Sequence, residues 1–290
     1  MGAIYKRELK SAFTGMTGPI FIAYVLVFMG FFAVSIVLQG LSPNFEYVVL
    51  SAGFFSMLAV PVLTMRSLPE ERHNKTDQLL FSLPITTLDI VLGKYLAMVT
   101  VLAVPVGVIS VYPLISMIFI TEGSLNFLII YGTILCYFLL GCAVIGICMF
   151  LSSMTESQVI SAIVNIAALI LIYMVSGLAN LIPQSGAVSL FILLVAALAI
   201  GYVVWLVCKN TIVGVAVGGA LAVATVVIYV IKADLFDGLA RELVSKLTLF
   251  EAIDTFAYGV FDVTAILYYL SVACLFVFLT VQSVEKRRWS

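Results

Sequence analysis

Charged residues are scarce in this chain. Only 10% of its 290 residues are Asp, Glu, Lys or Arg, whereas soluble domains contain about 25%. Hydrophobic residues make up 63% of the chain, and its net charge is −1. This composition excludes a soluble globular protein, a nucleic-acid-binding protein and a disordered chain, and it provides no charge field that would attract a charged partner. The sequence therefore predicts an all-α polytopic membrane protein.

The residues that support chemistry inside a membrane are also missing. The chain has a single histidine, His73, and no GxxxxGK[ST] loop, and its five cysteines follow no metal-ligand spacing. We therefore expect no catalytic residue, no metal ligand and no nucleotide site, which argues against an intramembrane enzyme. If the chain performs active transport, something else must supply the energy.

Ionisable residues are almost absent from the long apolar runs, which argues against a proton- or sodium-coupled carrier. An autonomous channel or secondary carrier nevertheless remains the alternative to a subunit that is driven by a separate energy source.

Apolar runs long enough to cross a bilayer, about 20 residues each, occur eight times. They are 19–39, 47–65, 94–120, 126–151, 158–180, 188–208, 212–231 and 263–283. Pro61 predicts a kink in the second run. Asn165 lies in the fifth run, where hydrogen bonding between helices is its expected role.

The distribution of Lys and Arg predicts the orientation. With the N-terminus inside, eleven of the fourteen fall on the cytoplasmic side, and only Lys232, Arg241 and Lys246 fall outside. Both termini are therefore expected in the cytoplasm. Removing the hairpin 188–231 does not change this result.

Three polar segments accompany this single transmembrane domain, which covers residues 1–290. Residues 1–14 predict a cytoplasmic amphipathic helix, with Glu8 as the one acidic residue on its apolar half. The loop 66–93 predicts a helix that starts near Pro69 and stops at Pro84, followed by a helix capped by Thr86 or Thr87. Residues 233–262 predict an extracytoplasmic amphipathic segment.

Several motifs in and around the loop resemble a known family. The loop contains Glu70-Glu71-Arg72, Thr76-Asp77-Gln78-Leu79-Leu80, Ser82-Leu83-Pro84 and Ile90-Val-Leu-Gly-Lys94-Tyr-Leu-Ala97. Outside it are Tyr5-Lys-Arg-Glu-Leu-Lys-Ser11, Tyr258-Gly-Val-Phe-Asp262, Tyr268-Tyr-Leu-Ser271 and Phe278-Leu-Thr-Val-Gln-Ser-Val-Glu-Lys-Arg-Arg-Trp289. Together these motifs, over about 1–180 and 245–290, resemble type-2 ATP-binding-cassette (ABC) transporter permeases, and most closely the gliding-motility and nitrous-oxide-accessory branch.

The chain departs from the family pattern in two places. Lys75 stands where many members have glycine, which an exposed helix tolerates. The hairpin 188–231 adds two spans to the six-span core of the family.

The resemblance implies a permease subunit of an ABC transporter that works as an exporter in the bacterial plasma membrane. It implies two cytoplasmic ATPase subunits as partners, which would bind ATP and Mg, together with a second permease copy or a paralogue. The ATPase-coupling loop would comprise Glu70, Glu71, Arg72, Thr76, Asp77, Leu79 and Leu80. A second cytoplasmic contact would comprise Thr155, Glu156 and Ser157, beside the amphipathic helix with Lys6, Arg7 and Glu8.

Overall fold

The structure, a computed structural model, describes residues 1–39, 44–76, 86–119, 126–181, 183–208, 211–232, 236–246 and 248–288. Helices dominate these residues, and no strand occurs among them. The chain forms two compact units, Met1–Leu171 with Leu249–Ser290 as unit 1, and Ile172–Thr248 as unit 2.

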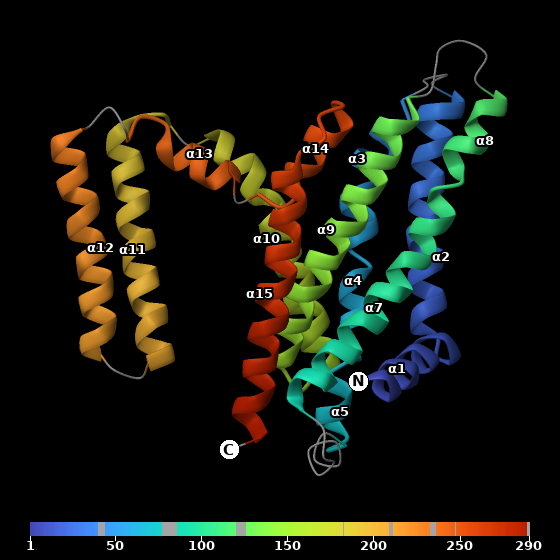
Figure 1. Cartoon of the computed structure of the whole chain (residues 1–290), viewed down its shortest axis with the longest axis horizontal. Helices are drawn as coiled ribbons and strands as arrows, with labels where there is room; N and C mark the ends of the chain where they lie inside the picture. The colour runs from blue at the N-terminus through green and yellow to red at the C-terminus, as the bar shows by residue number, and fades with distance from the viewer. Residues whose placement is uncertain are drawn as a thin grey trace. The chain divides into compact units, whose positions relative to one another are not determined.

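Unit 1 contains most of the helices (Figure 1). They are α1 (Gly2–Thr14), α2 (Thr17–Ala33), the π-helix η1 (Val34–Gln39), α3 (Glu46–Met57), α4 (Val60–Thr64), α5 (Pro69–His73), α7 (Thr87–Ile109), α8 (Tyr112–Phe119), α9 (Phe127–Ser153), the first part of α10 (Gln158–Leu181), α14 (Ala252–Ala257) and α15 (Val263–Arg288).

Five helical stretches in the described residues are long and apolar enough to cross a membrane, or six if the bent pair α3–α4 counts as one span. The five stretches are Thr17–Gln39, Thr87–Ile118, Phe127–Ser153, Gln158–Val175 and Val263–Arg287. This confirms a multi-pass helical membrane protein. The total of eight spans stays a prediction, because the described apolar stretches of the two remaining helices are shorter, Gly186–Val195 and Gly218–Tyr229.

Two local predictions are confirmed. The second apolar run is bent by 41° between Met57 and Val60, just before Pro61 at the start of α4. Proline lacks a backbone N–H and fits the first turn of a helix, so the chain restarts there in a new direction. Thr86 caps α7, since its side-chain oxygen accepts a hydrogen bond of 3.1 Å from the Asp89 N–H.

Helix α9 is the central helix of unit 1. In its most apolar stretch 72% of the residues are buried, against 17–39% in the other four full-length candidate spans. An added Cβ at Gly141 would lie 2.4 Å from Leu102 Cδ2, so any larger residue there would force the Leu102 side chain of α7 to move. The Tyr137 hydroxyl also pairs with Ser56 of α3 at 2.6 Å. Helix α9 therefore forms the core against which the neighbouring helices pack.

Unit 2 is built around a helical hairpin. Helices α11 (Gly186–Cys208) and α12 (Thr211–Ile231) lie side by side in opposite directions (Figure 1). Helix α13 (Leu239–Lys246) begins after Gly238, which has a positive φ of 76°. Its first turn is held at the start of the hairpin, because the Ala240 N–H donates to Ser189 Oγ at 3.3 Å.

Candidate functional site

Helix α1 is held tightly against α7. The side chain of Ile4 is buried against Gly93, where an added Cβ would lie only 3.1 Å from Ile4 Cγ2. The hydroxyl of Tyr5 pairs with Thr100 Oγ1 of α7 at 3.0 Å. Glycine at position 93 thus allows the amphipathic helix to lie directly on the beginning of α7.

Glu8 lies one helical turn after Ile4 and therefore on the same face of α1. This placement explains the acidic residue on the apolar half of the helix. The Glu8 carboxylate contacts Nζ of Lys94 on α7 at 3.1 Å.

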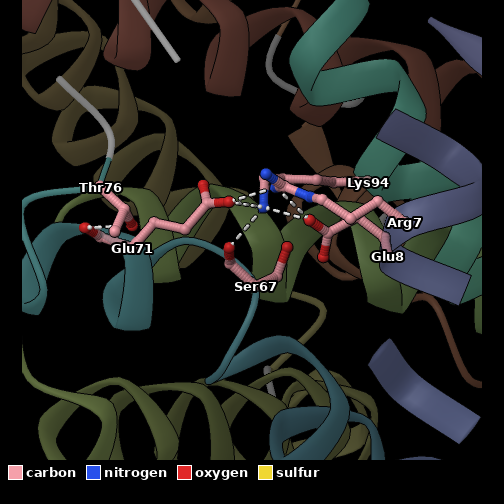
Figure 2. A network of polar contacts seen from close by, with 6 residues as sticks. All are labelled: Arg7, Glu8, Ser67, Glu71, Thr76 and Lys94. Atoms are coloured by element: carbon pink, nitrogen blue, oxygen red, sulfur yellow. Dashed lines mark hydrogen bonds and ion pairs between the residues drawn. The ribbon is translucent and has the colours of Figure 1, made fainter. Parts of the chain in front are cut away.

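Four charged side chains form a closed ring of alternating sign, which we call the charge ring: Arg7, Glu8, Lys94 and Glu71 (Figure 2). Nη2 of Arg7 lies 2.7 Å from Oε1 of Glu8 and 2.6 Å from Oε1 of Glu71. Nζ of Lys94 completes the ring at 2.9 Å from Oε1 of Glu71. The ring therefore joins α1, α5 and α7 through residues that are distant in sequence.

Lys94 is only 1% exposed, and its three N–H donors match three acceptors. Two acceptors are the ring carboxylates, and the third is the carbonyl oxygen of Ser67 at 2.8 Å (Figure 2). A buried ammonium group is tolerated only when it is paired and fully hydrogen-bonded. The position of the segment before α5 is therefore tied to that of Lys94.

The ring shifts the pKa values of its members. Burial alone would raise the pKa of Glu8, but the charges of Lys94 and Arg7 outweigh burial and lower it. Burial alone would lower the pKa of Arg7, but the carboxylates of Glu8 and Glu71 raise it. Both shifts favour the charged forms, so the ring is more stable with its charges in place.

Helix α5 ends in a tight turn at Lys75. The N–H of Thr76 donates to the Glu71 carbonyl at 2.9 Å, and the N–H of Lys75 donates to the Arg72 carbonyl at 3.0 Å. This is a Schellman-type helix end, in which the left-handed position belongs to Lys75 with φ 55°. The prediction of one helix from Pro69 to Pro84 is wrong, because the left-handed residue terminates α5 at His73.

The turn after α9 adjoins α5. Nη1 of Arg72 donates to the carbonyl oxygen of Thr155 at 3.3 Å. Glu156, whose side chain is 71% exposed, pairs with Arg287 of α15 at 2.7 Å. The Ser157 carbonyl accepts the Ser161 N–H at 2.9 Å as α10 begins. Residues 155–157 therefore connect α5 with the starts or ends of three long helices.

A buried polar cluster lies beneath this turn. Nδ2 of Asn165 donates to Ser152 Oγ at 2.9 Å and to Thr64 Oγ1 at 3.2 Å, and Ser161 Oγ donates to Ser152 Oγ at 2.8 Å. All four residues are completely buried. The expected interhelical role of Asn165 is confirmed, and the cluster fixes α4 to α9 and α10.

A family model for "ABC-2 family transporter protein" matches residues 6–212. The chain belongs to this family. It is therefore the membrane-embedded permease subunit of an ABC transporter, a class of subunit that works with ATPase subunits. No curated protein and no solved structure matched the chain.

All the members of the charge ring fall within the matched part of the permease, whereas helices α13 to α15 lie beyond it. Among the residues that the sequence singled out, the structure brings Arg7, Glu8 and Glu71 together. Arg72 lies against Thr155, and Lys6 is exposed. Asp77, Leu79 and Leu80 lie outside the described residues.

Two members of the site were missed by the sequence analysis, Lys94 and Ser67. A signal for Lys94 was available, because Ile90, Ala97 and Met98 place it on an apolar face of α7. A lysine on a buried helix face requires acidic partners. Ser67 contributes through its backbone carbonyl, which no side-chain pattern reveals.

Proposed function

We propose that this permease is half of a bacterial ABC exporter, in which two permease chains, identical or paralogous, bind two cytoplasmic ATPase subunits. The gliding-motility and nitrous-oxide-accessory branch is the proposed relationship within the family. We further propose that the chain crosses the plasma membrane eight times. Both termini would lie on the cytoplasmic side, on the basis of the Lys and Arg distribution.

The ATPase would dock on the surface formed by α5 and the turn 155–157, which we call the docking surface. The observation that carries this proposal is the hydrogen bond from Arg72 to the Thr155 carbonyl, because it joins the two predicted contacts into one surface. Glu70 and Glu156 are its accessible carboxylates, with side chains 41% and 71% exposed.

The connections of this surface explain how it would transmit force. When ATP closes the two ATPase subunits, the docking surface moves with them. The charge ring would pass this movement from α5 to α1 and α7, and the polar cluster of Thr64, Ser152, Ser161 and Asn165 would pass it to α9 and α10. Discrete packed elements of this kind move as rigid bodies.

Co-purification tests the docking surface. The chain is expressed with an ABC ATPase encoded next to it, as wild type and as the double variant Glu70→Arg and Glu156→Arg, and purified in a mild detergent. Because both changed side chains are accessible, the permease should remain folded and lose the ATPase band. The matched control is Lys232→Glu, an exposed charge reversal on the predicted outer side, which should retain the band.

An ATPase band that survives the double variant would refute this docking surface. Loss of the band in the Lys232→Glu control as well would show that charge reversal in general, and not the docking surface, removes the ATPase.

A further inference from the structure

A cavity of about 520 Å³ lies between α1, the segment from α4 to α5, and α7. Its volume falls within the range of about 300–1,000 Å³ that is typical of small-molecule sites. The cavity adjoins the charge ring, but most of its wall comes from other residues.

The wall has a polar part and an apolar part. The polar part carries hydroxyl groups and both signs of charge: its cations are Arg7, Arg66 and Lys94, and its carboxylates are Glu8, Glu70 and Glu71. The apolar part includes Leu63, Met98 and Val101. Among the lining residues that are described, three cations face three carboxylates, so the wall has no net charge. Such a wall favours an amphiphile whose polar end is itself zwitterionic.

The cavity is located where a lipid headgroup would be found. Thr17, one of its lining residues, begins the apolar stretch of α2, and Leu63, Met98 and Val101 belong to helices that continue into the membrane. The polar wall therefore lies at the membrane surface and the apolar wall below it.

Two of the lining charges are accessible to a ligand. Lys94, Glu8 and Glu71 are paired within the charge ring, whereas Arg66 and Glu70 form a longer ion pair, with 3.6 Å between Nε and Oε2 and side chains that are 44% and 41% exposed. The hydroxyl oxygen of Ser67 is buried and has no hydrogen-bond partner among the described residues. An accessible guanidinium and an accessible carboxylate thus line the cavity, and Ser67 adds a buried hydroxyl without a partner among the described residues.

We propose that this cavity binds the headgroup of a phospholipid that carries a primary amine, of the phosphatidylethanolamine type. The phosphate accepts hydrogen bonds from the Arg66 guanidinium. The ammonium group donates to the Glu70 carboxylate, and the glycerol end lies against Leu63 and Met98. The bound lipid would bridge α4, α5 and α7 from the membrane side.

Native mass spectrometry of the full chain in detergent, without any ATPase, tests this site. The ligands are phosphatidylethanolamine, phosphatidylcholine, phosphatidylglycerol and inorganic phosphate. Phosphatidylethanolamine should bind about tenfold more tightly than phosphatidylcholine, whose methylated amine cannot donate a hydrogen bond to Glu70. Arg66→Gln should weaken its binding by about tenfold, and Glu70→Gln should abolish the preference for the primary amine.

Lys10→Gln is the matched control, because Lys10 is an exposed cation of α1 that does not line the cavity. This variant should bind the lipid as the wild type does, and equal thermal midpoints in lipid-free detergent show that all the variants are folded. Equal weakening by Lys10→Gln and Arg66→Gln would show general surface attraction and overturn the site. Tighter binding of phosphatidylglycerol, or binding of inorganic phosphate with the affinity of the lipid, would overturn the assigned headgroup. Because no ATPase is present, these outcomes do not depend on the docking surface.

Discussion

Nζ of Lys94 lies 2.9 Å from Oε1 of Glu71, so a lysine near the start of α7 holds the segment that precedes α7 in the chain. The same ammonium group contacts Glu8 of α1 at 3.1 Å. One side chain therefore determines the positions of two peripheral helices relative to a membrane-spanning one.

Replacing Lys94 with methionine should destabilise the protein by about 3 kcal/mol, because it leaves two largely buried carboxylates without their ammonium partner. The thermal midpoint in detergent measures this loss. Adding Glu8→Gln and Glu71→Gln to Lys94→Met should restore most of the stability, since the uncompensated charges are removed. A triple variant no more stable than Lys94→Met would show that the charges are not the cause.

Acid should weaken the attachment of α1. The pKa of Glu8 in the folded protein is lower than its ordinary value of 4.5, so its ionised form stabilises the fold. This contribution is fully present above about pH 4.5 and is lost as the pH falls through the lowered pKa. Thermal midpoints measured from pH 7 to pH 3 should fall less steeply at the acid end in Glu8→Gln than in the wild type. Parallel curves would contradict the role of Glu8.

Lys75→Gly should stabilise the end of α5 by about 1 kcal/mol, because glycine adopts the left-handed conformation without strain. Hydrogen exchange of the Thr76 amide, which donates to Glu71, reports on this turn. Lys75→Ala removes the same charge but keeps a Cβ, so it should give no comparable protection. Equal protection of the Thr76 amide from exchange in both variants would show that the loss of the lysine charge, and not the backbone conformation, causes the stabilisation.

Gly93→Val should displace α1 from α7, since the new Cβ would lie 3.1 Å from Ile4 Cγ2 and overpacking of this kind costs about 1–3 kcal/mol. Limited trypsin cleavage after Lys6 and Arg7 should become faster. Gly107→Val in the same helix is the control, because an added Cβ there meets no atom within 4 Å. Unchanged cleavage in Gly93→Val would show that α1 does not depend on this contact.

The parts of the fold that depend on local physics were predictable from the sequence. A span must be apolar over its whole length, so α2, α9, α10 and α15 could be recognised from hydropathy. The bend before Pro61 and the cap at Thr86 follow from backbone chemistry within a few residues.

The site itself depends on contacts over long distances in sequence. Glu8 and Lys94 are 86 positions apart, and the sequence around either residue does not identify the other as its partner. The left-handed Lys75 was missed for a different reason: its side chain suits an exposed helix, and only the backbone hydrogen bonds of the helix end impose its φ angle.

The contrast between the charge ring and the Arg287–Glu156 pair implies an order of detachment in concentrated salt. At 1 M ionic strength the Debye length is about 3 Å, so electrolyte screens accessible charges strongly and enclosed ones weakly. Glu156 is 71% exposed, whereas Lys94 is 1% exposed. Concentrated salt should therefore release the end of α15 from the turn 155–157 first, while α1 and α5 remain bound to α7.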